Sequence, residues 1–398
     1  MGALRAARLK PVWSARDAFA PPGECHPWGP QGGMPTEDMD GPGHQEARPR
    51  RDPRFDVGRG AALWIIFSDH ISGNIVKQFT PVSLGFSDMA EVFVFLSGYV
   101  GGVASRGRIR REGTWGGFRR AFIRMGQIYL AMVLTLIVLD LTSAWLGAWF
   151  PNLLVRGAHR EAVPDSLGAW LLDVVLLREL ASEAAVLTLY FWFSLLLPAA
   201  VWLATRRPGL LALASFAFYV SAQLFPDSMA PPGLWGGAWY FNPFAWQMVF
   251  LSGVLLSVSR DLRARLPRGR SAVVASVLVL EGAFLARLFL SKDFIPLTGK
   301  ANLEALRVLH FGALLIVARV LMRPSTPLWE SRWLKPLVLC GRNSLMVFCV
   351  GVILAAVATT FLDSVGYAML GQVVANLSGW LLLTTTAALW TVAKRVMR

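Results

Sequence analysis

The chain has 398 residues, of which 55% are hydrophobic and only 16% are charged. A soluble protein carries roughly a quarter charged residues, so this composition excludes an ordinary soluble domain. The formal net charge of +14 could indicate a nucleic-acid partner. However, the basic residues lie between long apolar segments, which indicates a bilayer and no nucleic acid. The composition therefore predicts an all-α fold, a polytopic membrane helix bundle.

Residues 1–50 form a basic tail that is rich in Pro and Gly and has no apolar periodicity. We expect this tail to be disordered and cytoplasmic. No apolar h-region occurs within its first thirty residues, so it does not fit a cleavable signal peptide. The expected organisation is a tail over 1–50 and an integral membrane domain over 51–398.

About ten apolar segments follow, each near the roughly 20 residues that a helix needs to cross the hydrocarbon core. They are residues 60–79, 84–105, 120–146, 184–204, 208–224, 238–258, 271–291, 303–322, 336–361 and 369–394. The segment 147–183 is the only long loop. Its amphipathic stretch from Trp170 to Leu177 predicts a segment that lies across a membrane face.

Basic residues are distributed unequally between the expected loops. If the N-terminus is cytoplasmic, the inside loops and the C-terminus hold nineteen Lys and Arg without the tail, and the outside loops hold five. Cytoplasmic loops carry an excess of Lys and Arg. The bias therefore predicts an even number of spans, with both termini in the cytoplasm.

The first span holds several ionisable residues, which are costly inside a membrane and are therefore functional candidates. Arg59 and His70 are eleven residues apart, about three helical turns or ~16 Å. They therefore share one helix face. We expect Arg59 at the cytoplasmic boundary and His70 midway through the bilayer. Asp69 must point elsewhere, towards another span or into a cavity.

The second span begins with two acids, Asp88 and Glu91, which share a helix face near the outer third of the membrane. The short connection around Pro81 makes the first two spans antiparallel neighbours, so these acids could meet His70. A histidine held by a carboxylate can deprotonate a hydroxyl in group transfer. The alternative is that His70 is hydrogen-bonded inside the bundle, while the acids cap a helix or pair with Lys77.

Two later clusters carry further charges. Glu304, Arg307 and His310 form a polar stripe at the outer end of the eighth span, unless Glu304 and Arg307 only neutralise each other. Arg342 lies just inside the ninth span, where it can extend to the surface and anchor the topology. The functional alternative is that Arg342 joins Arg59 in holding an anionic ligand on the cytoplasmic side.

The remaining signals are weaker. Cys25, Cys340 and Cys349 are too few for a disulfide framework, and we expect free thiols with no redox or metal role. The aromatic stretch 240–247 is typical of a membrane interface, although Asn242 could line a cavity. No Walker loop, dinucleotide glycine pattern, zinc motif or nucleophile elbow occurs in the sequence. We therefore expect no metal site and no permanently bound cofactor.

Several of these blocks resemble the OpgC family of bacterial membrane proteins, across nearly all of the membrane domain. The similar blocks are residues 55–60, 67–70, 85–99, 241–247, 300–303, 307–310 and 341–345. OpgC proteins are implicated in the succinylation of osmoregulated periplasmic glucans. They are similar to the ten-span membrane acyltransferases that modify carbohydrates, which share an Arg and a His separated by ten residues in the first span. Arg59 and His70 match that pair.

The resemblance implies a location in the bacterial inner membrane, with acyl-CoA as a cytoplasmic co-substrate and a periplasmic glycan hydroxyl as the acceptor. If the acyl group is succinyl, its free carboxylate needs a cation, for which Arg307 is the candidate. Direct transfer and a route through an acyl-histidine are both compatible with the sequence. The hypothesis assigns catalysis to His70, Glu91, Asp88 and Asp69; acyl-CoA binding to Arg59, Arg342 and Asn343; and acceptor or acyl-carboxylate binding to Lys300, Asn302, Arg307, His310 and Asn242.

Two other classes of protein compete with this reading. Charged residues in the membrane middle also mark the path of a transporter or flippase, here for an anionic or sugar substrate. Against this class, no inverted repeat and no matching pair of Gly- or Pro-broken spans is obvious in the sequence. The third class is a non-enzymatic assembly or sensor protein that docks through the arginine-rich tail.

Overall fold

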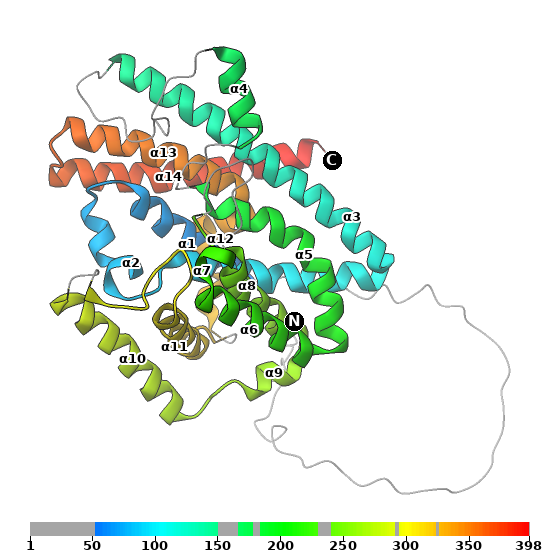
Figure 1. Cartoon of the computed structure of the whole chain (residues 1–398). Coiled ribbons are helices and arrows are strands. Elements are labelled where there is room, and N and C mark those ends of the chain that lie inside the picture. The colour runs from blue at the N-terminus through cyan, green and yellow to red at the C-terminus, as the bar shows by residue number, and fades with distance from the viewer. Residues whose placement is uncertain are drawn as a thin grey trace, which may run out of the picture. The chain divides into compact units, whose positions relative to one another are not determined.

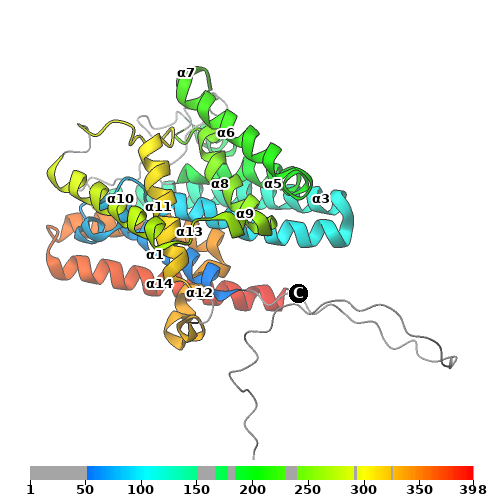
Figure 2. The same cartoon turned by 90° about the horizontal axis from the view of Figure 1, so that it is seen from below.

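The structure is a computed structural model that describes residues 52–149, 166–177, 184–229, 240–290, 294–323 and 326–397. All regular elements within these ranges are helices, as Figures 1 and 2 show. The expected all-α fold is confirmed for this part of the chain. The tail predicted over 1–50 lies outside the described residues.

In chain order, the helices are α1 (Pro53–His70), α2 (Pro81–Leu84), α3 (Met89–Trp149), α4 (Leu167–Val175), α5 (Val186–Arg206), α6 (Pro208–Leu224), α7 (Pro226–Met229), α8 (Pro243–Val258), α9 (Arg260–Arg265), α10 (Arg270–Phe289), α11 (Ala305–Leu321), α12 (Lys335–Arg342), α13 (Ser344–Ser364) and α14 (Met369–Val396). Short 3₁₀ helices cover Ile75–Phe79, Pro327–Glu330 and Arg332–Leu334.

Five described helices are long and apolar enough to cross a membrane: α3, α5, α10, α13 and α14. Two shorter apolar helices, α6 and α8, accompany them. These helices indicate a membrane protein. The number of ten spans and the cytoplasmic position of both termini stay predictions.

The second and third expected spans form one long helix, α3, that bends at Gly113. This glycine has φ 73° and ψ 178°, a conformation that costs a residue with a side chain far more than glycine. The basic segment between 105 and 120, which we expected to be a loop, is therefore helical except at Gly113. The N-terminal part of α3 starts at Met89, five residues later than expected.

The first helix starts earlier and ends earlier than the span expected over 60–79. Asp52 caps the start, because its side chain accepts a hydrogen bond from the Arg54 amide at 3.0 Å, and Pro53 takes the first helical position. The helix ends at His70, and Gly73 then turns the chain with φ 73°. His70 is therefore the last residue of α1 and does not lie in the middle of a span.

The ninth expected span, 336–361, is interrupted at Asn343, which separates α12 from α13. The Asn343 amide donates to the backbone oxygens of Leu339 and Ala387 and to the Thr391 hydroxyl. Lys394 in turn donates to the Asn343 side-chain oxygen at 3.0 Å. These bonds satisfy the polar groups that a broken helix exposes inside a membrane, and they fix the break against α14.

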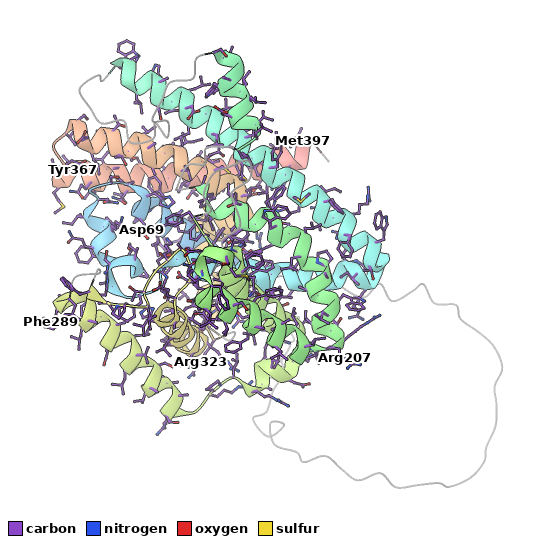
Figure 3. The ribbon with its side chains drawn as sticks, viewed as in Figure 1. Asp69, Arg207, Phe289, Arg323, Tyr367 and Met397 are labelled. Atoms are coloured by element: carbon purple, nitrogen blue, oxygen red, sulfur yellow. The ribbon has the colours of Figure 1, made fainter. Side chains whose placement is uncertain are left out.

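The helices differ in how much of their apolar surface is covered. In the most apolar window of α13, 56% of the residues are buried, compared with 11% in α10. α13 and α14 form an antiparallel pair, with Tyr367 in the turn between them and Met397 at the far end of α14 (Figure 3). α13 is thus a core helix, whereas α10 has the exposed apolar surface expected of a lipid-facing helix.

α1 and α12 approach each other closely at two glycines. A Cβ atom on Gly60 would overlap the Leu337 carbonyl oxygen, and a Cβ atom on Gly341 would overlap the Asp56 carbonyl oxygen. Small residues that let two backbones meet are typical of helix contacts in membranes. This contact holds α1 beside the break between α12 and α13.

We predict that Gly341→Ala destabilises the protein by about 1–3 kcal/mol, because the added methyl group meets rigid backbone. Gly282→Ala is the matched control, since Gly282 lies in α10 with open space around its Cα. Alanine there should be neutral or stabilising by up to ~1 kcal/mol, because it favours the helix. Thermal unfolding in detergent measures both variants, and equal melting temperatures would contradict the prediction.

Candidate functional site

A buried cluster of charges joins the start of α3 to α11 and to the loop before α11. Arg307 Nε donates to Glu91 Oε1 at 2.7 Å, and Arg307 Nη2 contacts Asp88 Oδ2 at 3.2 Å. Lys300 Nζ lies 2.8 Å from the same Asp88 oxygen. Glu91 is 0% exposed and Arg307 3%. Two acids and two bases therefore neutralise one another in the interior, as buried charges require.

The two acids also cap the helix that carries them. Asp88 Oδ1 accepts a hydrogen bond from the Ala90 amide at 2.7 Å, and Glu91 Oε2 accepts one from the Asp88 amide at 2.9 Å. This reciprocal pattern is a capping box, and it satisfies backbone N–H groups that a helix start leaves unpaired. The helix-capping alternative is thus confirmed for both acids. Both carboxylates also form ion pairs with Arg307, and Asp88 forms a further ion pair with Lys300.

The loop that carries Lys300 is held by α6 and by the start of α8. Its backbone and one side chain accept hydrogen bonds from Tyr219 (to Leu303 O), Gln223 (to Asn302 O), Trp246 (to Lys300 O) and Asn242 (to Asn302 Oδ1). Asn242 and Asn302 therefore act first as a clamp on this loop. Burial alone would lower the pKa of the Lys300 ammonium, but the Asp88 carboxylate raises that pKa above its ordinary value, so Lys300 stays charged.

His70 lines a cavity of about 350 Å³, which we call the His70 cavity. Its polar wall consists of Asp69, His70, Lys77, Asp88 and Lys300, and its apolar wall includes Phe93, Tyr240, Phe241 and Phe348. The cavity therefore gathers a histidine, two acids and two ammonium groups. The sequence suggested that His70 could meet Asp88. In the structure, both residues line this cavity.

Two hydrogen-bonded connections hold the end of α1 in place. The Thr80 hydroxyl donates to Asp69 Oδ1 at 2.6 Å. The amides of Asn74 and Asn376 bond each other reciprocally at 3.0 and 3.1 Å, and both residues are buried. The chain that follows His70 is thus tied to α14, which limits how far the imidazole can move.

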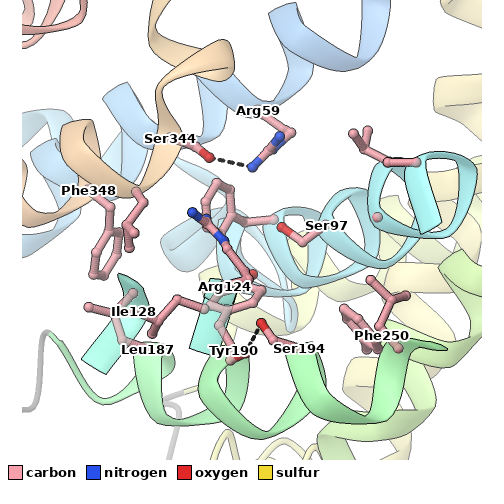
Figure 4. Close-up of a pocket in the computed structure, with 16 residues that line it drawn as sticks. Arg59, Ser97, Arg124, Ile128, Leu187, Tyr190, Ser194, Phe250, Ser344 and Phe348 are labelled. Carbon is pink, nitrogen blue, oxygen red and sulfur yellow. Dashed lines mark hydrogen bonds between the residues drawn. The ribbon is translucent and has the colours of Figure 1, made fainter. Parts of the chain in front are cut away.

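Arg59 lines a second cavity of about 250 Å³, the Arg59 cavity shown in Figure 4. The guanidinium donates to the Ser344 hydroxyl, at the start of α13. Arg124, from the second half of α3, lies on the same cavity. The cavity wall is otherwise mostly apolar, with three further hydroxyl groups from Ser97, Tyr190 and Ser194. Two guanidinium groups in such an environment suit an anionic ligand.

The other predicted site residues line neither of these two cavities. Glu91 and Arg307 are packed behind Asp88, and His310 Nδ1 lies 2.6 Å from the Ser87 hydroxyl. Instead of the Glu304–Arg307 pairing considered from the sequence, Arg307 bonds both acids of α3, and Glu304 accepts a hydrogen bond from the Gly299 amide. Of the expected stripe on α11, Arg307 therefore enters the ion cluster, and His310 bonds Ser87 instead.

Arg342 and Asn343 lie at the break that starts α13. Arg342 Nε donates to Asp56 Oδ2 at 3.1 Å, and the Arg342 side chain is 49% exposed. Asn343 bonds α14, as described above. Neither residue contacts the Arg59 cavity directly, although Ser344, the next residue along the chain, does. Their assignment to acyl-CoA binding stays a prediction.

Sequence reasoning missed Arg124 and Tyr190. Arg124 lies inside the expected span 120–146, and its position within an apolar segment was the available signal. Tyr190 lies in the expected span 184–204 and lines the Arg59 cavity. An unaccompanied tyrosine in an apolar span carries no sequence signal that separates it from a core aromatic residue.

Apolar helices that are long enough to cross a bilayer, with two cavities lined by charged side chains, indicate a helical membrane protein. A family model described as OpgC protein matches residues 51–395. The chain belongs to the OpgC family, which confirms the resemblance seen in the sequence. Searches of curated proteins and of solved structures found no match.

We predict that Arg307→Met destabilises the protein by about 3–5 kcal/mol, because it leaves the Glu91 charge buried without its main partner. The double variant Arg307→Met/Glu91→Gln should recover part of this loss, since glutamine is neutral and still completes the capping box. Arg108→Met is the control, because Arg108 and Glu112 form an exposed pair on the same helix. It should cost no more than ~1 kcal/mol.

Thermal unfolding in detergent measures all three variants. If the double variant is no more stable than Arg307→Met, the buried charge of Glu91 is not the cause of the loss.

Proposed function

We propose that the chain is a membrane O-acyltransferase of the bacterial inner membrane. It moves an acyl group from cytoplasmic acyl-CoA to a hydroxyl of a periplasmic glycan. The acyl group that we propose is succinyl. Membership of the OpgC family suggests an acyltransferase. The observation that carries the proposal is that one helix, α1, presents Arg59 to one cavity and His70 to another, and that the two cavities share wall residues.

The donor enters the Arg59 cavity in this proposal. Arg59 and Arg124 bind the phosphates through bidentate hydrogen bonds, for which guanidinium groups are suited. The mostly apolar wall accommodates the pantetheine arm and leads the thioester towards His70. The nucleotide end lies outside this small cavity, on the side where Arg342 is half-exposed. The distance of ~16 Å between Arg59 and His70 along the helix is spanned by that arm.

The reaction takes place at the His70 cavity. The glycan hydroxyl loses its proton to the imidazole of His70 as its oxygen attacks the thioester carbonyl carbon. The carbon–sulfur bond then breaks, the new ester bond remains, and the proton passes from the imidazolium to the departing CoA thiolate. A route through an acyl-histidine needs the same residue, so both routes depend on His70.

The charges around His70 suit both substrates. Lys77 and Lys300 are cations that line the cavity. They therefore replace Arg307, which does not line it, as candidate partners of a succinyl carboxylate. The Asp69 and Asp88 carboxylates can accept hydrogen bonds from sugar hydroxyls. Tyr240, which is 48% exposed, offers an aromatic face on which a sugar ring can stack.

A transporter of an anionic or sugar substrate is the competing function. Two cavities with a common wall would also serve alternating access around a central site. The two functions differ in their product, because an acyltransferase leaves an ester on the glycan and a transporter moves its substrate unchanged. Purified protein with radiolabelled succinyl-CoA and a glucan acceptor separates them.

We predict that His70→Ala lowers the rate of acyl transfer by about 100- to 10,000-fold, the usual contribution of a general base. Val82→Ala is the control, since Val82 lines the same cavity without an ionisable group, and it should retain activity. The measurement is the initial rate with succinyl-CoA at matched membrane levels. Normal activity of the His70 variant would rule out the proposed base.

We predict that Arg59→Met and Arg124→Met each raise the KM for acyl-CoA by about 10- to 100-fold, as expected when a charged hydrogen bond is lost. The KM for an acyl N-acetylcysteamine thioester, which lacks the phosphates, should stay unchanged. Arg206→Met controls for charge, because Arg206 is exposed at the end of α5. Equal increases for both donors would show that these arginines do not bind the phosphates.

A further inference from the structure

Two aromatic residues are common to the walls of both cavities. Phe93, from the start of α3, and Phe348, from α13, line the Arg59 cavity and the His70 cavity alike. Their rings are stacked, with centroids 6.4 Å apart and an interplanar angle of 18°. Phe93 is 5% exposed and Phe348 3%. These two side chains therefore lie where the two cavities adjoin.

Contacts on the Arg59 side hold Phe93 in place. The Arg59 guanidinium carbon lies 5.7 Å from the Phe93 ring centroid, and Tyr190 meets the same ring edge-on at 5.6 Å. A cation over an aromatic face is attractive. A ligand that binds Arg59 and Arg124 therefore approaches the group that steadies Phe93, so donor binding and the position of this ring are coupled.

The two rings belong to different helices, and this permits an opening. α3 and α13 pack directly against each other, and the start of α3 is fixed by the capping box and the ion cluster. A rotamer change of Phe348, or a small shift of α13 against α3, separates the rings without breaking a charge pair.

We infer that Phe93 and Phe348 form a partition through which the acyl arm of the donor reaches His70, and that this partition selects the size of the acyl group. The inference rests on the proposed acyl transfer for the selection of the donor. The partition itself is independent of catalysis. A short acyl group passes between the rings, whereas a bulky one meets them.

The partition can be tested by cysteine labelling. Ser97→Cys places a thiol on the Arg59 cavity, in a chain whose Cys25, Cys340 and Cys349 are replaced by serine. A membrane-impermeant maleimide is applied to inside-out and to right-side-out vesicles. We expect labelling from one face only, and labelling from both faces after Phe348→Ala or Phe93→Ala.

Phe250→Ala is the matched control. Phe250 is a buried phenylalanine that lines the Arg59 cavity alone, so its removal enlarges that cavity and leaves the partition intact. Labelling should stay one-sided in this variant. Phe348→Leu provides a milder change if an alanine variant does not elute as folded protein. One-sided labelling of all Phe93 and Phe348 variants, or two-sided labelling of the Ser97→Cys parent, would overturn the partition.

Donor selection is read from kcat/KM with acetyl-, succinyl- and hexanoyl-CoA. Phe348→Ala should raise the ratio for hexanoyl-CoA over acetyl-CoA by about 10-fold or more, and Phe348→Trp should lower it. Unchanged ratios would overturn the selecting role even if labelling becomes two-sided. Failure of the proposed function is distinct, because the parent protein would then transfer none of the three groups while the labelling result still decides the partition.

Discussion

The ion pairs of Arg307 with Asp88 and Glu91 constrain most of what lies around the site. Because these charges are buried, the loss of any one of them leaves an uncompensated charge in a low-dielectric interior. The acids cap α3, so the pairs fix where that helix begins. This start places Phe93 in the wall between the cavities and Ser97 in the Arg59 cavity. Lys300 completes the cluster and brings its loop to the His70 cavity.

Contacts at both ends of α1 hold its two candidate site residues, Arg59 and His70, beside their cavities. Its close contact with α12 sets Arg59 beside Ser344 at the helix break, and its end at His70 is tied to α14 through the asparagine pair. A break in a membrane helix exposes backbone and side-chain groups that can bind a ligand. One helix thus carries a residue of the cation-lined cavity and a residue of the histidine-lined cavity, and Phe93 and Phe348 line both.

Much of the helical architecture follows from apolar length alone, because a run near 20 residues admits few other structures in a bilayer. The features that shape the site do not follow from it. The break at Asn343 lies inside a continuous apolar pattern and depends on Thr391 and Lys394, almost fifty residues away. His70 and Asp88 could be placed together because one ends α1 and the other precedes α3, the next long helix along the chain. The partners of Arg307 lie more than two hundred residues earlier, and no local spacing indicates them.

In the proposed function, His70 catalyses acyl transfer to a glycan. Mass spectrometry of periplasmic and surface glycans shows whether this transfer occurs. Cells carrying the wild-type protein, His70→Ala at equal membrane level, or neither protein are compared. We expect an acyl adduct with the wild-type protein alone, with a mass that identifies the donor. The same adduct in cells carrying His70→Ala would contradict the role of His70, and unchanged glycans in all three strains would contradict glycan acylation.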